Sequence, residues 1–149
     1  MNFIYFEKVA DVTYPIGGEF YDNFDYIRKA AKILHNIIDE GKDIALVCRG
    51  ISGCIIAGAV GYILQKRGRK VTIVISRKSE NTHGGSMAGY HRILNGVVPV
   101  VIDDFVSSGN TINEILIDLD KRVNKKTYPF LCIANFWSMN KLEANRKKA

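Results

Sequence analysis

The sequence predicts an α/β fold in which a mostly parallel open sheet is flanked by helices. Short apolar runs typical of buried strands alternate along the chain with longer segments of helical periodicity. Strands that are covered by helices on both faces belong to parallel sheets. Three of these apolar runs also lead into polar loops, and in open sheets such loops bind ligands beyond the carboxyl ends of the strands.

The first half of the chain supplies three strands and two helices. Residues 3–9 are expected to form a short strand. Residues 22–40 are expected to form a helix, because apolar side chains recur there at helical spacing. Residues 43–48 (DIALVC) are typical of a buried strand, and residues 54–66 predict a helix with small residues on one face. Residues 70–76 (KVTIVIS) predict the next strand.

The second half continues the alternation after a long polar loop. Residues 77–92 have no periodicity and carry several cations, which predicts a loop. Residues 97–102 predict a strand, residues 110–123 a helix and residues 128–135 the last strand. We expect residues 1–149 to form a single domain, since this length suits one domain and no linker or repeat interrupts it.

Composition limits the class of protein. The hydrophobic fraction of 47% suits a globular chain, no apolar run is long enough to span a bilayer, and the N-terminus lacks a secretion pattern. A cytoplasmic protein is therefore expected. Cys48, Cys54 and Cys132 lie among apolar residues, which is typical of reduced, buried thiols, and no pair has a zinc-site spacing.

The net charge of +6 leaves the class of partner open. A solvated surface is the usual explanation for clustered Lys and Arg, although a basic field also attracts an anionic ligand or nucleic acid. Basic platforms with interleaved aromatic side chains are not evident, so nucleic-acid binding ranks last among the functions considered.

The segment 97–111 (VVPVVIDDFVSSGNT) places two acids between an apolar strand and a loop of small residues. The loop 107–111 leads into a helix, so its N–H groups can converge on a phosphate. Asp103 and Asp104 would repel that phosphate but could accept hydrogen bonds from nearby hydroxyl groups. Ribose 5-phosphate satisfies both demands; the simpler alternative is a helix N-cap beside a solvated acid.

This segment resembles the phosphoribosyl-pyrophosphate motif of type I phosphoribosyltransferases, which is an apolar strand, two acids and a Thr/Ser-rich loop with glycine. The resemblance implies that the two acids hold the ribose hydroxyls and that the loop holds the 5′-phosphate. It implies these substrate-binding residues: Asp103, Asp104, Phe105, Val106, Ser107, Ser108, Gly109, Asn110 and Thr111.

The turn after the strand 43–48 also leads into a helix and carries one fixed cation, Arg49. An ordinary strand-to-helix turn explains it equally well. In the family this position is the pyrophosphate loop. The resemblance therefore implies a pyrophosphate-binding role for five residues: Arg49, Gly50, Ile51, Ser52 and Gly53.

The long loop is polar, glycine-rich and cationic, which favours a lid that closes on a charged substrate; a disordered surface loop is the alternative. Its segment RKSENTHGG resembles the catalytic loop of orotate phosphoribosyltransferases. The match covers Arg77, Lys78, His83 and Gly84, while Asn81 stands where that family usually has lysine. The resemblance implies catalytic roles for Arg77, Lys78 and His83 together with Asp104.

The implied reaction joins a nucleobase, orotate or another, to the ribose of phosphoribosyl pyrophosphate and releases pyrophosphate. Mg²⁺ is the implied cofactor, with Asp103 and Asp104 the only side chains expected to touch it, and a homodimer is the implied assembly. In orotate phosphoribosyltransferases an N-terminal segment, the hood, reads the base, and the resemblance implies a reduced hood in this chain. Phe136 and Trp137 could stack on a base or pack in a core or dimer contact. A protein that binds phosphoribosyl pyrophosphate or a nucleotide without turnover is the main alternative, favoured by Asn81.

Overall fold

The computed structural model describes residues 19–77, 87–105, 110–123 and 130–134. Their strands form one five-stranded sheet in the order β3-β2-β1-β4-β5. Every neighbouring pair is parallel except β2 and β3. The strands are β1 (Asp43–Cys48), β2 (Val71–Ser76), β3 (Met87–Ala88), β4 (Val97–Phe105) and β5 (Phe130–Ala134). The predicted fold class, a mostly parallel open sheet flanked by helices, is confirmed.

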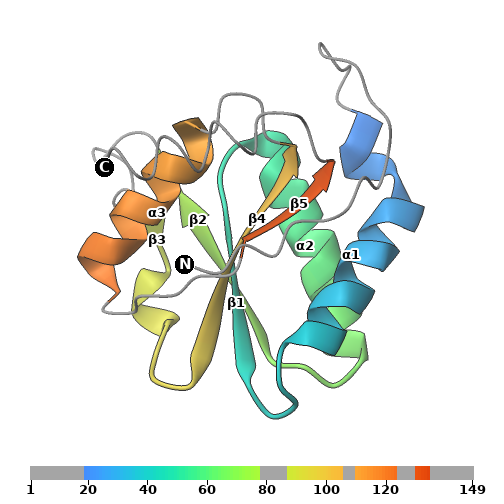
Figure 1. Cartoon of the computed structure of the whole chain (residues 1–149), viewed down its shortest axis with the longest axis horizontal. Coiled ribbons are helices and arrows are strands. Elements are labelled where there is room, and N and C mark those ends of the chain that lie inside the picture. The colour runs from blue at the N-terminus through green and yellow to red at the C-terminus, as the bar shows by residue number, and fades with distance from the viewer. Residues whose placement is uncertain (1–18, 78–86, 106–109, 124–129, 135–149) are drawn as a thin grey trace.

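The helices cover both faces of the sheet, with α1 and α2 on one side and α3 on the other (Figure 1). Each layer has its own apolar core. Leu34 of α1 and Ile56 of α2 pack with Leu46 on one face, whereas Ile115 of α3 packs with Val47 on the other. The helical elements are η1 (Glu19–Asp22), α1 (Phe24–Ile37), α2 (Ile51–Lys66), η2 (Tyr90–Arg92) and α3 (Asn110–Arg122).

Helix α1 is capped at both ends by side chains. Asn23 is the N-cap, and its Oδ1 accepts a hydrogen bond from the Tyr26 N–H at 3.3 Å. At the other end the buried Arg69 guanidinium donates to four main-chain carbonyls at 2.9–3.3 Å. Those carbonyls belong to His35, Ile38, Asp39 and Lys42. Carbonyls at a helix C-terminus have no partner within the helix, so Arg69 satisfies groups that burial would otherwise leave unpaired.

Helix α2 lies close against the sheet because it presents glycine to the strands. A Cβ added at Gly61 would lie 3.3 Å from Ile73, 3.4 Å from Val71 and 3.5 Å from Leu46. A larger side chain there would push the helix outward. The small residues predicted on one face of this segment therefore set how closely α2 approaches β1 and β2.

The largest differences from the predicted element boundaries are in α2, in β4 and in the segment 77–92. Helix α2 begins at Ile51 rather than at residue 54, and β4 continues through both acids to Phe105 rather than ending at residue 102. The end of the segment 77–92 is not an unstructured loop, because it contains β3 and η2. The predicted strand 3–9 lies outside the described residues.

Among the described residues, no helix combines the length and the apolar character needed to cross a bilayer. Helix α1, for example, alternates a buried apolar face with charged residues.

Candidate functional site at the carboxyl edge of the sheet

The candidate site lies where the direction of the chain across the sheet reverses. From β1 the chain moves outward to β2 and β3, and it then returns to the other side of β1 as β4 and β5. The carboxyl ends of β1 and β4 therefore stand side by side, with connections leaving in opposite directions. In open α/β sheets such a reversal opens the crevice in which ligands bind.

The turn after β1 exposes the N-terminus of α2 at this crevice. Gly50 is the N-cap, and its positive φ of 81° favours glycine. Its carbonyl accepts the first helical hydrogen bond, from the Cys54 N–H at 3.0 Å. No side chain caps this helix end. The first N–H groups of α2 thus lack partners within the helix and point toward the crevice, where an anion could accept their hydrogen bonds.

Three of the residues predicted to form a pyrophosphate loop, Ile51, Ser52 and Gly53, belong instead to the first turn of α2. The predicted helix began three residues too late, because the sequence ISG has no strong helical signature. Only Arg49 and Gly50 form the turn itself. The predicted residues are therefore contiguous at the edge, but on a more rigid element than a loop.

The Arg49 side chain bridges three elements across the carboxyl edge. Its Nε and Nη2 donate to the hydroxyl of Ser76, at the end of β2, at 3.2 and 2.9 Å. Its Nη1 forms an ion pair with Glu114 of α3. The side chain is only 9% exposed, whereas that of Glu114 is 58% exposed. The guanidinium is held firmly while its partner carboxylate remains open to solvent, so an incoming anion could replace Glu114.

The two acids of the sequence motif lie within β4 and are buried, Asp103 at 9% and Asp104 at 8% exposure. The Asp104 N–H donates to Asp103 Oδ1 at 2.9 Å. Burial raises the pKa of the Asp103 carboxyl well above its usual range, and the hydrogen bond and charge of Asp104 raise this pKa further. The N–H of Asp104 lowers the pKa of Asp103 but does not offset burial. Asp103 therefore binds a proton more tightly than an exposed carboxyl does, and a ligand cation would compete with that proton.

The acid pair and the α2 N-terminus are in direct contact. A Cβ added at Gly53 would lie 3.1 Å from Asp103 Oδ1. Glycine at this position therefore allows the helix start to lie against the carboxyl. The structure brings together the two sequence segments predicted to bind opposite ends of one ligand.

A cavity of about 430 Å³ opens at the start of α2, between the ends of β1 and β2. Polar and cationic groups line one part of it, and apolar side chains line the rest. The lining residues are Arg49, Gly50, Ile51, Cys54, Ile75, Ser76 and Arg77. Arg77, predicted to be catalytic, is thus placed at the edge beside Arg49.

Other predicted site residues are placed only in part. Asn110 and Thr111 begin α3, which is the helix start expected behind a phosphate loop. The side chain of Phe105 is not among those described, although its backbone ends β4. Several predicted residues lie outside the described residues: Lys78, Asn81, His83, Gly84, Val106, Ser107, Ser108, Gly109, Phe136 and Trp137.

Sequence reasoning missed three residues at this edge. Ser76 could have been noticed, because it is the first polar side chain at the carboxyl end of the apolar run 71–76. Glu114 follows Asn110 by one helical turn and so lies near the start of α3. Cys54 was expected to be buried with Cys48, but it is half-buried and lines the cavity.

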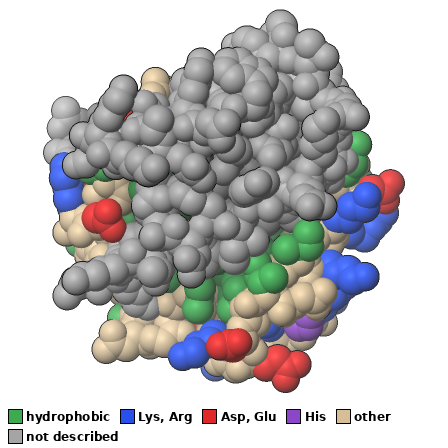
Figure 2. Space-filling view, in the orientation of Figure 1, with side chains coloured by type: hydrophobic (Ala, Val, Ile, Leu, Met, Phe, Trp, Pro, Cys, Tyr) green, Lys and Arg blue, Asp and Glu red, His purple; other side chains and the backbone are tan. Residues whose placement is uncertain are grey.

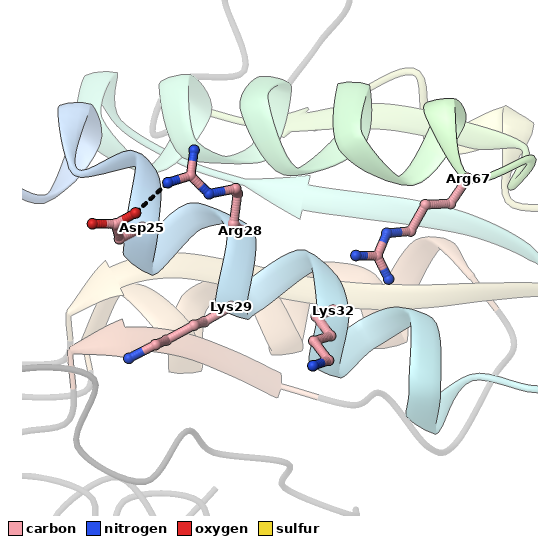
Figure 3. Close-up of a pocket in the computed structure, with 5 residues that line it drawn as sticks. All are labelled: Asp25, Arg28, Lys29, Lys32 and Arg67. Atoms are coloured by element: carbon pink, nitrogen blue, oxygen red, sulfur yellow. Dashed lines mark hydrogen bonds and ion pairs between the residues drawn. The ribbon is translucent and has the colours of Figure 1, made fainter.

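A second cavity, of about 380 Å³, lies against α1 and contains none of the predicted site residues (Figure 3). It is lined by Asp25, Arg28, Lys29, Lys32 and Arg67. Arg28 pairs with Asp25, and Arg67 reaches toward α1 from the end of α2. Lys and Arg side chains gather on the margin of the molecule over this helix (Figure 2). The side chains of the Arg28–Asp25 pair are 64% and 77% exposed, so this basic surface is well solvated.

Comparison with known proteins agrees with the geometry. The sequence model of the phosphoribosyl transferase domain matches residues 17–134. No curated protein sequence matches the chain. Hypoxanthine phosphoribosyltransferase from Trypanosoma cruzi, solved with the product IMP, is similar in structure with a TM-score of 0.50 and 12% identity, over 75% of this chain and 74% of that chain.

A Helicobacter pylori xanthine-guanine-hypoxanthine phosphoribosyltransferase has a TM-score of 0.49 and 18% identity, over 85% of this chain and 92% of that chain. At 12% identity, the likeness to the Trypanosoma cruzi enzyme shows the fold alone. The match of the domain model extends from the segment before α1 to the end of β5 and includes both parts of the crevice. The chain therefore belongs to the phosphoribosyl transferase domain family.

Proposed function

We propose that this protein joins a nucleobase to the ribose of phosphoribosyl pyrophosphate and releases pyrophosphate. One observation carries the proposal: the uncapped N-terminus of α2 and the buried Asp103–Asp104 pair meet at the β1/β4 reversal. One element suits an anion, and the other suits hydroxyl groups. Phosphoribosyl pyrophosphate presents both within a few ångströms.

Each part of the site has a task in this reaction. The N–H groups at the start of α2, with Arg49, bind the pyrophosphate group. Asp103 and Asp104 accept hydrogen bonds from the ribose hydroxyls. The helix start at Asn110 and Thr111, together with the loop that precedes it, binds the 5′-phosphate.

The chemistry is a displacement at C1 of the ribose. A ring nitrogen of the base forms the new bond to C1, and the bond from C1 to the pyrophosphate oxygen breaks with its electron pair leaving on that oxygen. The ribose gains oxocarbenium character, as in glycosyl transfer generally. Arg49 and Arg77 are placed to stabilise the charge that develops on the leaving group, and loss of one such fixed donor typically costs about 3–4 kcal/mol in the barrier. Lys78 and His83 are proposed for the same task on the resemblance of their loop.

Mg²⁺ suits the residues present. Among the described residues no group of three His, Cys, Asp or Glu side chains could hold a metal, and the edge offers two carboxyls. Mg²⁺ is commonly held by one or two carboxylates together with substrate phosphates and water. Asp103 and Asp104 would therefore hold the Mg²⁺ ion, which would supply charge neutralisation at the leaving group.

The identity of the base is the finer part of the proposal. The RKSENTHGG segment favours orotate, because it resembles the catalytic loop of orotate phosphoribosyltransferases. Purine bases form the second group to test. The replacement of the usual lysine by Asn81 favours a second candidate function, binding of phosphoribosyl pyrophosphate without turnover.

The decisive experiment measures pyrophosphate release from phosphoribosyl pyrophosphate and Mg²⁺ with orotate, hypoxanthine, guanine, xanthine, adenine and uracil in turn. We expect release with orotate. Pyrophosphate release with a purine alone would support a transferase and reject orotate as its substrate. No release with any base would reject the transferase in favour of a binding protein.

Calorimetry with phosphoribosyl pyrophosphate and Mg²⁺ tests the site itself. Asp104→Asn should weaken binding at least about tenfold, because it replaces one of the two carboxyl oxygens that accept hydroxyl hydrogen bonds with an amide NH₂. The matched control is Asp120→Asn, which makes the same change on the exposed face of α3. Equal affinities for the two variants would place the ligand elsewhere.

A further inference from the structure

Two thiols enclose the turn that leads into α2. Cys48 is the last residue of β1, and Cys54 lies in the first turns of α2. Their sulfur atoms are 3.0 Å apart, and the Cys48 thiol donates a hydrogen bond to the Cys54 sulfur. Residues 49–53, the proposed pyrophosphate-binding segment, lie between them in the chain. Any bond formed between these sulfurs would close a ring around that segment.

The two thiols differ in access. Cys48 is fully buried, with its sulfur also 3.7 Å from the Val74 carbonyl oxygen. Burial raises the pKa of the Cys48 thiol well above its usual range, and the hydrogen bond with Cys54 raises it further. Cys54 is half-buried and lines the cavity of about 430 Å³ beside Arg49. A small reagent that enters this cavity therefore meets Cys54 first.

We propose that Cys48 and Cys54 form a dithiol site that a small-molecule disulfide, such as oxidised glutathione, converts into an intramolecular disulfide. The Cys54 thiolate attacks one sulfur of the reagent, forming a mixed disulfide and releasing one thiol. Cys48 then attacks the Cys54 sulfur, passes its proton to the departing thiolate and releases the second thiol. The two protein thiols are oxidised, and the reagent's disulfide is reduced to two thiols.

We expect closure of this bond to move the start of α2. A disulfide bond is about 2.05 Å long, so the sulfurs must approach by about 1 Å. Cys48 is fixed by its burial and by its pairing with Ile75 of β2. The shift therefore falls on Cys54, whose N–H is bonded to the Gly50 carbonyl, and on Gly53, which lies against Asp103. The N–H groups that face the crevice are displaced together.

The consequence for binding depends on the proposed function, in which these N–H groups hold pyrophosphate. In that case the disulfide form should bind pyrophosphate with Mg²⁺ at least about tenfold more weakly than the dithiol form, because hydrogen bonds to a charged group depend steeply on alignment. The Cys48–Cys54 pair would then control access of the substrate to the site.

Peptide mapping of the full chain tests the disulfide directly. After equilibration with oxidised and reduced glutathione, the disulfide form should lose about 2 Da, the mass of two hydrogens. Trypsin cleaves after Arg49, so peptides 43–49 and 50–66 should remain joined until a reductant is added. Cys48→Ala and Cys54→Ala should each abolish the joined pair, whereas Cys132→Ala should retain it. A disulfide that includes Cys132, or glutathione adducts alone, would overturn the dithiol site.

Calorimetry with pyrophosphate and Mg²⁺ tests the consequence on the same samples. The affinity of Cys54→Ala should be the same before and after glutathione treatment, because this variant lacks the thiol that reacts first. Wild type should lose affinity on oxidation. Equal affinity of the two wild-type forms would overturn control by the disulfide. A protein that forms the disulfide but binds no pyrophosphate when reduced would refute the proposed function and, with it, that control, while the mapped disulfide would stand.

Discussion

Arg69 and Asp103 are two buried ionisable side chains at opposite edges of the sheet, and their surroundings differ. Arg69 precedes β2 and donates to four carbonyls around the end of α1. Asp103 lies in β4 two residues before its end, accepts one N–H and stands beside a second acid rather than a cation. They are 7% and 9% exposed, so burial alone does not distinguish them.

The difference indicates which edge serves stability and which serves function. A buried charge with several hydrogen bonds is compensated by the fold itself, whereas a buried acid beside another acid lowers stability unless a ligand compensates it. The amino edge of the sheet is therefore expected to resist substitution for reasons of folding. The carboxyl edge is expected to become more stable when its acids are neutralised, at the expense of binding.

The largest expected effect is that of Arg69→Met. This change removes donors from four carbonyls and should lower the free energy of unfolding by roughly 3–5 kcal/mol, the range for breaking a buried charged network. Urea unfolding measures it, with the exposed Arg67→Met as the matched control. A loss below about 1 kcal/mol would show that these carbonyls find other partners.

Asp103→Asn should raise the free energy of unfolding, by less than Arg69→Met lowers it. At neutral pH it should raise the free energy of unfolding by roughly 1–3 kcal/mol, because an amide has no charge to desolvate and can still accept the Asp104 N–H. The pKa of Asp103 is raised in the folded state, so the wild type loses stability as pH rises through that pKa. The variant lacks this loss. The stability difference should vanish below the ordinary carboxyl pKa, and a difference independent of pH would contradict this account.

Gly53→Ala tests the contact between α2 and Asp103. Its new Cβ would lie 3.1 Å from Asp103 Oδ1, while a Cβ at Gly58 in the same helix meets nothing within 4 Å. Gly58→Ala should raise the free energy of unfolding by about 0.5–1 kcal/mol through helix propensity. The free energy of unfolding of Gly53→Ala should be roughly 1–2 kcal/mol lower than that of Gly58→Ala. Thermal unfolding of the pair measures the gap. Equal stabilisation by both would mean that the helix start is not held against the carboxyl.

Arg49→Gln should have the smallest effect on stability, about 1 kcal/mol or less, because the partner carboxylate is solvent-exposed. Its effect on pyrophosphate binding should be larger, at least about tenfold, because a fixed cation is removed from the crevice. Arg28→Gln breaks the exposed pair with Asp25 and serves as the control for charge. If both variants bind pyrophosphate equally weakly, the field of the whole basic chain, rather than this site, attracts the anion.

The layers and the central strand were predictable because burial leaves a strong pattern in the sequence. The strand 43–48 agrees with β1 residue for residue, since an uninterrupted apolar run is what a strand covered on both faces requires. The antiparallel β3 is two residues long and leaves no pattern to find. The α2 start was missed because Ile51, Ser52 and Gly53 carry no helical periodicity of their own.

The site was predictable in its parts but not in its contacts. Charge interrupts the apolar run at the two acids, which predicts that the strand ends there. Pairing of Asp103 with Cys132 and of Phe105 with Ala134 nevertheless continues the ladder. The Arg49–Glu114 ion pair joins residues 65 apart in the chain. The packing of α3 against the sheet brings Arg49 and Glu114 together, and no local sequence pattern predicts this contact.

The tightly held proton of Asp103 has a consequence for how ligand capture is detected. A cation or sugar hydroxyl that needs the ionised carboxyl must drive that proton into solution. Binding would then acidify an unbuffered sample, and its apparent heat would vary with the ionisation enthalpy of the buffer. The difference in the proton count between wild type and Asp103→Asn, obtained from a set of buffers, would report the proton that this side chain releases.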